Sequence, residues 1–527
     1  MTLLRLMIRR HRALIGCWSV LLIGLSATAS AYQSTYPTLQ QRLVAVALAQ
    51  HNAATTMLYG NLPDPGAPAQ MFGWEIGAIA TILTAIMAVV VAVALTRTAE
   101  DDGTLEVVRS CGVGPRAPLL SGFAVLALVT AVLTVGCTIG AGLDTGRVDG
   151  ITWSGAAAFG SSVGLTFLLF ALLTAVVAQV MPTAGGARLL GFAAVGAAFG
   201  IRSIADTQHI AWANWLSPLG LRATVRPFTD NRWWVLATYL IVAAATAWLA
   251  ATLQGRREYR AGLLGRPSRR PSRLNISSSL GLAVRLARST LVVWTVAVAG
   301  IGTLFAVMGS GVVEQSQTSD VGGFLGAQLG AGDPVAGYFG YCGTVVGIVV
   351  SSFAVLSMLR SRHDEADGRT DQVLASGARR WAPLAAQVAV TAAGTATVLI
   401  ATGALSAVVA PSVIDGTDVA ARSFSYIAGQ WPAAMAMAGW TAMLVGRWPR
   451  LSPLAWVPLV ASATFALLGQ LLGVPRSIRD LGIFQHIPDV AAPSPDVQGI
   501  LVLLAAATVT TLLGVLGVTR RDIVTGR

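Results

Sequence analysis

The sequence is divided by long apolar runs that alternate with short polar segments. Twelve of these runs approach the length of about 20 residues that a helix needs to cross the hydrocarbon core of a membrane. They cover residues 13–31, 71–95, 119–140, 153–178, 188–201, 233–252, 291–310, 336–359, 384–410, 426–445, 454–474 and 500–518. A helix satisfies its own backbone hydrogen bonds in lipid, whereas irregular chain does not. The pattern predicts an all-α polytopic membrane protein with about 12 transmembrane helices.

The composition supports a lipid environment. Of the 527 residues, 54% are hydrophobic and only 11% are charged, and the mean hydropathy is +0.67. Such a chain has too little polar surface to coat a soluble globule. Its four cysteines lie in or beside predicted spans with no paired spacing, so neither a disulfide framework nor a metal site is expected.

The basic residues are all arginines, and they give the chain a net charge of +12. They cluster in the first 12 residues, in the segment 256–273, and at the C-terminal end. Arginine-rich loops of membrane proteins face the cytoplasm, and an even number of spans puts both termini there. We therefore expect membrane lipids and no nucleic acid as the partner of these charges. The arginine-rich segment itself is expected to anchor the topology, with binding of anionic lipid as the alternative.

The N-terminal segment imitates a cleavable signal peptide, with a basic start, an apolar core and the small-residue tail "ATASA". Its residues Arg9, Arg12 and Trp18 recur with the same spacing where the second half of the chain begins and no signal could act: Arg285, Arg288 and Trp294. We therefore predict an interfacial basic helix followed by a first span.

Two polar islands interrupt the apolar pattern: "EDDGTLEVVRSCGVGPRAPL" at 100–119 and "EADGRTDQVLASGARRWAPL" at 365–384. Eight positions are identical without a gap, each 265 residues apart. The chain is thus predicted to be a tandem duplication of six spans, which enter the membrane in the same direction because six is even. The expected domains are a first six-helix half at 1–252, a cytoplasmic linker at 253–289 and a second six-helix half at 290–527.

Each island is expected to form a short helix, with Asp102 or Asp367 as its N-cap and Gly112 or Gly377 at its end. A helix of two turns is not stable in water by itself, so it must dock against its own membrane helices or against a partner. An ordinary solvated turn is the alternative. The island sequence recurs twice within otherwise divergent apolar sequence, and this favours a docking surface.

A duplicated six-span permease with a basic helix before the first span, and a polar island between the second and third spans of each half, resembles ABC exporter permeases of the ABCG-like branch. The islands, the segment "YPTLQQRLVAVALAQHNAATTMLYG" and "WLSPLG" are similar to the actinobacterial exporters of polyketide antibiotics, including tetronasin-type and multidrug permeases. This resemblance implies a bacterial cell membrane location and two copies of a separate ATP-binding subunit. It also implies that the islands are coupling helices which contact those subunits through Glu100, Asp102, Gly103, Glu106, Arg109, Glu365, Asp367, Gly368 and Asp371.

This chain is not expected to hydrolyse ATP itself. A P-loop needs a lysine that reaches the nucleotide phosphates, and the sequence contains no lysine. ATP and Mg²⁺ would therefore bind to the partner subunits, and no cofactor is expected on this chain. At the position of Arg109 the second copy has Leu374, so the two contacts with the partner cannot be identical.

The spans contain few charges, which favours an amphipathic or lipophilic cargo such as an antibiotic. Glu75 is the main exception, and it is either an interfacial carboxylate or a partner for cationic cargo. Neighbouring aromatic residues either form an interfacial belt or line an upper cavity between the halves; the predicted pathway comprises Glu75, Phe72, Trp74, Tyr338, Phe339 and Tyr341. The alternative to an ATP-driven exporter is an ion-coupled secondary multidrug transporter, which usually needs more intramembrane ionisable groups.

Overall fold

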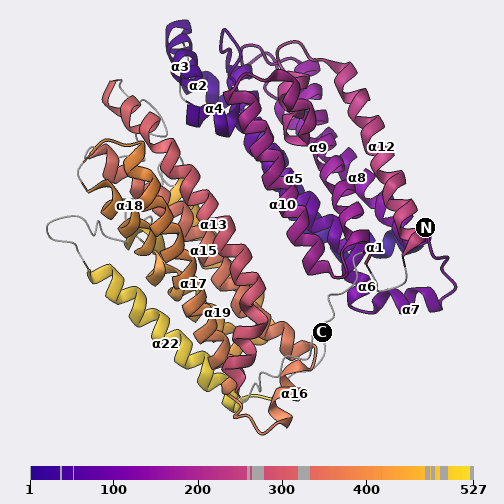
Figure 1. Ribbon diagram of the computed structural model, residues 1–527, viewed down its shortest axis with the longest axis vertical. Helices are drawn as coiled ribbons and strands as arrows, with labels where there is room; N and C mark the ends of the chain where they lie inside the picture. The colour runs from indigo at the N-terminus through magenta and orange to yellow at the C-terminus, as the bar shows by residue number, and fades with distance from the viewer. Residues whose placement is uncertain are drawn as a thin grey trace. The chain divides into compact units, whose positions relative to one another are not determined.

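The computed structural model describes residues 2–35, 38–51, 53–257, 262–263, 278–318, 333–416, 418–468, 475, 481–486 and 497–522. Within these residues the chain is helical and has no strand. It divides into two compact units, Met1–Ser272 (unit 1) and Arg273–Arg527 (unit 2). The division falls inside the predicted linker 253–289, of which residues 258–261 and 264–277 lie outside the described residues. The long helices of each unit run alongside one another (Figure 1).

Ten helical segments of the described chain are long and apolar enough to cross a membrane: Leu3–Gln33, Pro68–Asp101, Ala117–Gly142, Trp153–Val180, Ala184–Thr207, Trp233–Arg256, Ser279–Val307, Val335–Ala366, Ala382–Ser412 and Gln498–Arg520. They match ten of the twelve predicted spans. The other two coincide with shorter helices, Trp431–Arg447 and Trp456–Leu468, and residues 469–474 of the eleventh predicted span lie outside the described residues. The chain is thus a multi-pass helical membrane protein.

Unit 1 contains α1 (Thr2–Ser26), α2 (Ser30–Thr35), α3 (Leu39–His51), α4 (Ala53–Tyr59), α5 (Pro68–Val93), the π-helical turn η1 (Ala94–Thr98), α6 (Ala99–Asp101), α7 (Thr104–Ser110), α8 (Ala117–Gly142), α9 (Trp153–Val180), α10 (Ala184–Thr207), α11 (Leu221–Val225) and α12 (Trp233–Arg256). Several starts follow from local chemistry. The hydroxyls of Thr152 and Thr183 accept backbone N–H bonds at the N-caps of α9 and α10. Proline at the first turn of α5 and of α8 costs no helical hydrogen bond.

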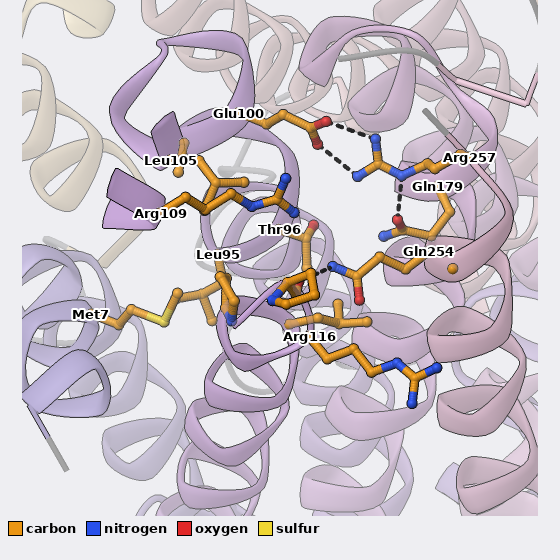
Figure 2. Close-up of a pocket in the computed structure, with 15 residues that line it drawn as sticks. Met7, Leu95, Thr96, Glu100, Leu105, Arg109, Arg116, Gln179, Gln254 and Arg257 are labelled. Atoms are coloured by element: carbon orange, nitrogen blue, oxygen red, sulfur yellow. Dashed lines mark hydrogen bonds and ion pairs between the residues drawn. The ribbon is translucent and has the colours of Figure 1, made fainter. Parts of the chain in front are cut away.

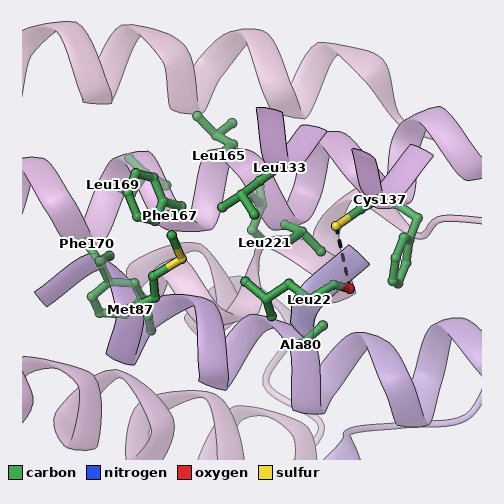
Figure 3. Packing of buried hydrophobic residues seen from close by; sticks show 14 of the residues in the cluster. Leu22, Ala80, Met87, Leu133, Cys137, Leu165, Phe167, Leu169, Phe170 and Leu221 are labelled. Atoms are coloured by element: carbon green, nitrogen blue, oxygen red, sulfur yellow. Dashed lines mark hydrogen bonds between the residues drawn. The ribbon is translucent and has the colours of Figure 1, made fainter. Parts of the chain in front are cut away.

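Helix α9 is the centre of unit 1, because most of its 28 residues are buried. Its residue Phe167 packs in one cluster with Leu22 of α1, Met87 of α5 and Leu133 of α8 (Figure 3). Small residues bring α8 and α9 together, since a Cβ atom on Gly160 of α9 would lie 2.5 Å from a carbonyl oxygen of α8.

The N-terminal segment forms one continuous helix that belongs to this core. Leu22 of α1 is fully buried, and Ile23 and Ser26 pack against Gly136 and Gly140 of α8. The basic start and the first span predicted from the sequence are therefore two parts of α1, which is an integral helix of unit 1.

Unit 2 contains α13 (Ser279–Thr318), α15 (Pro334–Ala366), α16 (Arg369–Ala375), α17 (Ala382–Val409), α18 (Val419–Ala428), α19 (Trp431–Arg447), η5 (Pro449–Ala455), α20 (Trp456–Leu468), η6 (Ile483–His486) and α22 (Gln498–Arg520). Here the closest approach joins α19 to α22. A side chain at Gly439 or Gly446 of α19, or at Gly514 of α22, would meet the backbone of the other helix. Such glycine seams let two membrane helices pack at backbone contact.

Candidate functional site

Each island is formed by a sharp break between two helices. In unit 1 the chain leaves α6 at Asp102, turns at Gly103 with φ +74°, and begins α7. In unit 2 it leaves α15 at Asp367, turns at Gly368 with φ +71°, and begins α16. The predicted N-caps at the two aspartates are therefore wrong. These aspartates close the preceding helix, and the following glycines cap the island helix because a left-handed turn is least costly for glycine.

The ends of the island helices agree with the prediction. Gly112 follows α7 with φ +82°, and Gly377 follows α16 with φ +87°. Neither α7 nor α16 contains a buried residue. Both short helices therefore lie on the surface of their units, joined to the body by the residues before them.

In unit 1 the first island is joined to the last helix by a buried ion pair, which we call the first fork. The Arg257 guanidinium, just after α12, donates to both carboxylate oxygens of Glu100 at 2.7 and 2.6 Å (Figure 2). Its Nε donates to Gln179 of α9 at 2.7 Å. Only 1% of Glu100 is exposed. A bidentate guanidinium–carboxylate pair fixes both position and orientation, so the first fork connects three helix ends.

Unit 2 contains the same arrangement, which we call the second fork. The Arg521 guanidinium, just after α22, donates to both oxygens of Glu365 at 2.5 and 2.6 Å. Its Nε donates to the backbone carbonyl of Gly446 in α19 at 2.7 Å. Sequence reasoning counted Arg257 and Arg521 only as topology-setting charges. A signal was present, because each is the second of two arginines that directly follow an apolar span.

The two forks differ in their surroundings. In unit 1 the helix before the island contains the π-turn η1, and Arg97 within it is buried. Its guanidinium lies 3.2 Å from Glu100 and donates to the Pro182 carbonyl at 2.8 Å. In unit 2, α15 is described as one continuous α-helix up to Ala366. In the described part of the chain, Arg97 and Arg257 thus both contact the glutamate of the first island, and Arg521 contacts that of the second.

The exposed residues of the islands include acidic side chains close to the glycine turns, and arginines further along each island, among them Arg116 and Arg379. Asp102, Glu106 and Val107 are exposed in the first island, and Asp367 and Asp371 in the second. Glu100 and Glu365, which the resemblance assigned to direct contact with a partner, are instead buried within their own units. The structure gives these two carboxylates an internal role, and it leaves the others on the surface.

The first island also contacts the N-terminal helix. Arg10 of α1 lies 3.7 Å from the Asp102 carboxylate and donates to the Thr104 hydroxyl at 3.3 Å. The remaining predicted island residue, Arg109, is half-buried and lines a pocket behind α7. The two islands therefore present different surfaces next to the same internal fork.

The residues predicted to line a substrate pathway are divided between the two units, and three of them are buried in the core of their own unit. Phe72 is fully buried, in contact with the rings of Phe159 and Phe228 of its own unit. Tyr338 and Phe339 are buried in the core of unit 2, where the Tyr338 hydroxyl donates to the Phe305 carbonyl at 2.6 Å. These three rings therefore pack inside their own units, and their place in a substrate pathway stays a prediction.

The other three pathway candidates keep some exposure. Glu75 accepts a hydrogen bond from the Tyr32 hydroxyl at 2.8 Å. The Trp74 indole donates to the Gly60 carbonyl at 2.6 Å and borders a pocket of about 370 Å³. Tyr341 is half-buried against the core of unit 2. At the end of unit 1 away from the island, Glu75 and Trp74 are therefore the polar contact points of α5.

The motif "RSIAD" at 202–206 forms the end of α10 and closes this pocket. Arg202 donates to the carbonyl oxygens of Met57 and Leu58 at 2.5 and 2.7 Å, and Arg222 donates to that of Tyr59. We call this group of contacts the carbonyl staple. Burial, together with the nearby Arg202, lowers the pKa of Arg222 to about 10, so Arg222 is still charged at neutral pH. The second copy of the motif, at 476–480, lies outside the described residues.

Nothing in the described part of the chain is arranged to bind a metal. No three or more histidine, cysteine, aspartate or glutamate side chains of these residues gather into a candidate metal site. The four cysteines are free thiols.

Many apolar spanning helices, in two units that each carry a surface island, define a polytopic membrane permease. The family described as the multidrug efflux system permease Rv1217c, C-terminal domain, matches residues 276–518, a range within unit 2. The multidrug efflux system permease protein Rv1217c of Mycobacterium tuberculosis is 31% identical over 528 aligned residues, which cover 99% of this chain and 94% of that protein. The chain belongs to this family of multidrug efflux permeases.

Proposed function

We propose that this permease is the membrane subunit of an ATP-driven exporter of amphipathic or lipophilic compounds, including antibiotics. Two copies of a separate ABC ATP-binding subunit would supply ATP and Mg²⁺. The multidrug efflux relative supports export of drugs. The absence of lysine from the sequence excludes a P-loop on this chain.

The observation that carries this proposal is the duplication of the fork. In both units, the glutamate that begins the island is bound bidentately by the arginine that directly follows the last helix of the unit. A force on α7 or α16 is therefore passed to α12 or α22 through a rigid ionic contact instead of a flexible loop. Two such contacts, one in each unit, are suited to a partner that consists of two subunits.

In this proposal the partner contacts the exposed island residues, and the buried glutamates pass the resulting movement to α12 and α22. The surface would consist of Asp102, Glu106, Asp367 and Asp371 around the glycine turns. Closure of the ATP-binding pair would push both islands, and the two halves would change from one access state to the other. Glu100 and Glu365 act through the forks, and Arg109 faces a pocket within unit 1.

The proposed topology is twelve spans in two parallel six-helix halves, with α19 and α20 as the two short spans. The arginine-rich ends of the helices, where both forks lie, would face the cytoplasm together with both termini of the chain. The pocket beside Trp74 and the Glu75 carboxylate would then lie towards the outer face. A cationic amphipathic cargo could meet this carboxylate on its way out.

The test is ATP hydrolysis and drug efflux by the permease purified with its ATP-binding subunit. In the double variant Glu106→Arg/Asp371→Arg the exposed acids of both islands are reversed, and we expect drug-stimulated hydrolysis to fall at least about tenfold, as for lost complementary charges at an interface. Asp415→Arg is the matched control, since Asp415 is also exposed but follows the far end of α17. Unchanged hydrolysis and efflux in the double variant would contradict the proposal.

The same preparation separates this function from ion-coupled transport. In proteoliposomes, ATP alone should drive uptake of a lipophilic dye into vesicles with the islands outward, and a proton or sodium gradient alone should not. Transport by a gradient without ATP would favour the secondary transporter.

A further inference from the structure

The pocket behind the first island has the chemistry of a site for an anionic headgroup. It has a volume of about 380 Å³ and is bordered by residues of η1, α6, α7, α8, α9 and α12. Three arginines line it, Arg109, Arg116 and Arg257, against the single carboxylate of Glu100. The lining as a whole therefore carries three guanidinium groups against one carboxylate, which is an excess of positive charge.

The two arginines approach from different elements. Arg109 is half-buried on α7, and its side chain extends towards Glu100 and Thr96 (Figure 2). Arg116 caps α8 and is exposed at the edge of the pocket. Among the described residues, Arg116 makes no ion pair. Guanidinium groups on two sides of one pocket can bind a phosphate oxygen each.

The rest of the lining is amphipathic. Thr96, Gln179 and Gln254 supply hydroxyl and amide groups, and the apolar part of the lining comes from Met7, Leu95, Leu105 and Leu119. Directly after Leu119, the exposed face of α8 continues with Leu120, Leu128 and Val132 along a candidate membrane span. A ligand with an anionic head and an apolar chain can therefore place its head in the pocket and its chain along α8.

The second island has no equivalent charge. The positions of Arg109 and Arg116 are occupied there by Leu374 and Trp381. The pocket beside α16 is lined by Arg360 and Arg369, and both already pair with Asp364, at 3.9 and 2.9 Å. The first pocket thus has three arginines against one carboxylate and the second has two against one, so the larger excess of positive charge lies in unit 1.

We propose that the pocket of the first island binds the phosphate headgroup of one anionic phospholipid, with an acyl chain against α8. Basic pockets between helix ends at the cytoplasmic side of a membrane protein are suited to such headgroups. A lipid held there contacts α7, α8 and α12 together, next to the first fork. The proposal depends neither on the cargo nor on the ATP-binding subunit.

The test is native mass spectrometry of the purified full-length permease titrated with phosphatidylglycerol. In the double variant Arg109→Leu/Arg116→Trp the pocket receives the residues of the second copy, and we expect affinity for the tightest-bound lipid to fall about tenfold. In the matched control Arg379→Leu/Arg380→Trp, two exposed arginines of the second island are removed, and affinity should be unchanged. Equal losses in both variants, or no loss in the first, would overturn the proposal.

Two further arms identify the ligand and guard against misfolding. Phosphatidylcholine should not replace phosphatidylglycerol, and a large excess of inorganic phosphate should not displace it. Displacement by phosphate would overturn the lipid assignment in favour of a soluble oxyanion. If the double variant does not purify as a monodisperse protein, Arg116→Gln at the exposed pocket edge takes its place, with a loss of about threefold expected; wild-type affinity in this single variant would also count against the site.

Discussion

The two units of the permease make the same ionic contact but support it differently. In unit 1 the Nε of Arg257 is held by the side chain of Gln179, and a second arginine, Arg97, lies against the same glutamate. In unit 2 the Nε of Arg521 is held by the backbone carbonyl of Gly446. The contact is thus common to both halves, while the packing behind it has diverged.

The tightest helix pair also differs between the units. In unit 1, Gly160 and Gly164 of α9 lie against α8. In unit 2, the glycine seam joins α19 to the last helix, α22. The carbonyl that holds Arg521 comes from this seam. We therefore expect α22 to move only together with α19, while α12 can move relative to α9 by exchanging the bond to Gln179.

The largest expected effect tests the two forks against each other. Glu100→Gln removes the carboxylate that Arg97 and Arg257 share in a buried place, and leaves Arg97 with Asp101 alone, at 3.5 Å. Breaking a buried pair in this way should destabilise the protein by about 3–5 kcal/mol. Glu365→Gln should cost less, because Arg521 is partly exposed and keeps its bond to the Gly446 carbonyl. Thermal unfolding in detergent measures both.

Glu106→Gln is the control for this comparison, since Glu106 is exposed on the same island. Its unfolding temperature should match the wild type. An equal or larger loss in Glu365→Gln than in Glu100→Gln would mean that Arg97 does not distinguish the forks.

The next effect tests the seam. Gly446→Ala places a methyl group against the backbone of Gly514, and the overpacking should lower the free energy of unfolding by about 1–3 kcal/mol. Gly255→Ala in α12 is the matched control, because a Cβ atom there meets open space. This substitution should be neutral or stabilising by up to about 1 kcal/mol, as alanine favours a helix. If both variants unfold at the same temperature, then α22 is not packed more tightly at Gly446 than α12 is at Gly255.

A smaller effect tests the support of the first fork. Gln179→Ala removes a hydrogen bond to a charged guanidinium and should cost about 1.5 kcal/mol. Gln254→Ala, whose amide donates only to the Pro115 carbonyl at the same pocket, should cost less. Double-mutant cycles of each with Arg257→Leu should couple for Gln179 alone. Coupling of Gln254 to Arg257 would contradict the assigned contacts.

The smallest effect should be equal in the two units. Gly103→Ala and Gly368→Ala force alanine into the left-handed region, at about 1 kcal/mol each, and neither added Cβ atom meets another atom. Gly114→Ala, in open space with no positive φ, should leave the unfolding temperature unchanged. Unequal losses at Gly103 and Gly368 would show that the two turns are not equivalent.

The parts of this fold that depend on local chemistry could be predicted from the sequence. Apolar length located ten spanning segments, and the spacing of Gly112 and Gly377 located the ends of the island helices. Both signals act within a few residues of the position that they determine. The capping error at Asp102 and Asp367 has the same origin, because an aspartate before a glycine can either begin a helix or end one.

The parts that depend on distant partners could not be predicted. Glu100 and Arg257 are 157 residues apart, and Glu365 and Arg521 are 156 residues apart, in a chain rich in arginine near helix ends. The sequence alone does not indicate which arginine reaches which glutamate. The burial of Phe72 could not be predicted for a related reason, since hydropathy gives the depth of a side chain in the membrane but not the direction in which its helix face points.

The carbonyl staple sets the order in which unit 1 can be completed. The carbonyl oxygens of Met57, Leu58 and Tyr59 accept their hydrogen bonds from Arg202 and Arg222, which lie 144 to 163 residues later in the chain. A ribosome releases the acceptors long before the donors. Within unit 1, the segment that follows the first span can therefore complete these contacts only after the fifth span and Arg222 have been synthesised.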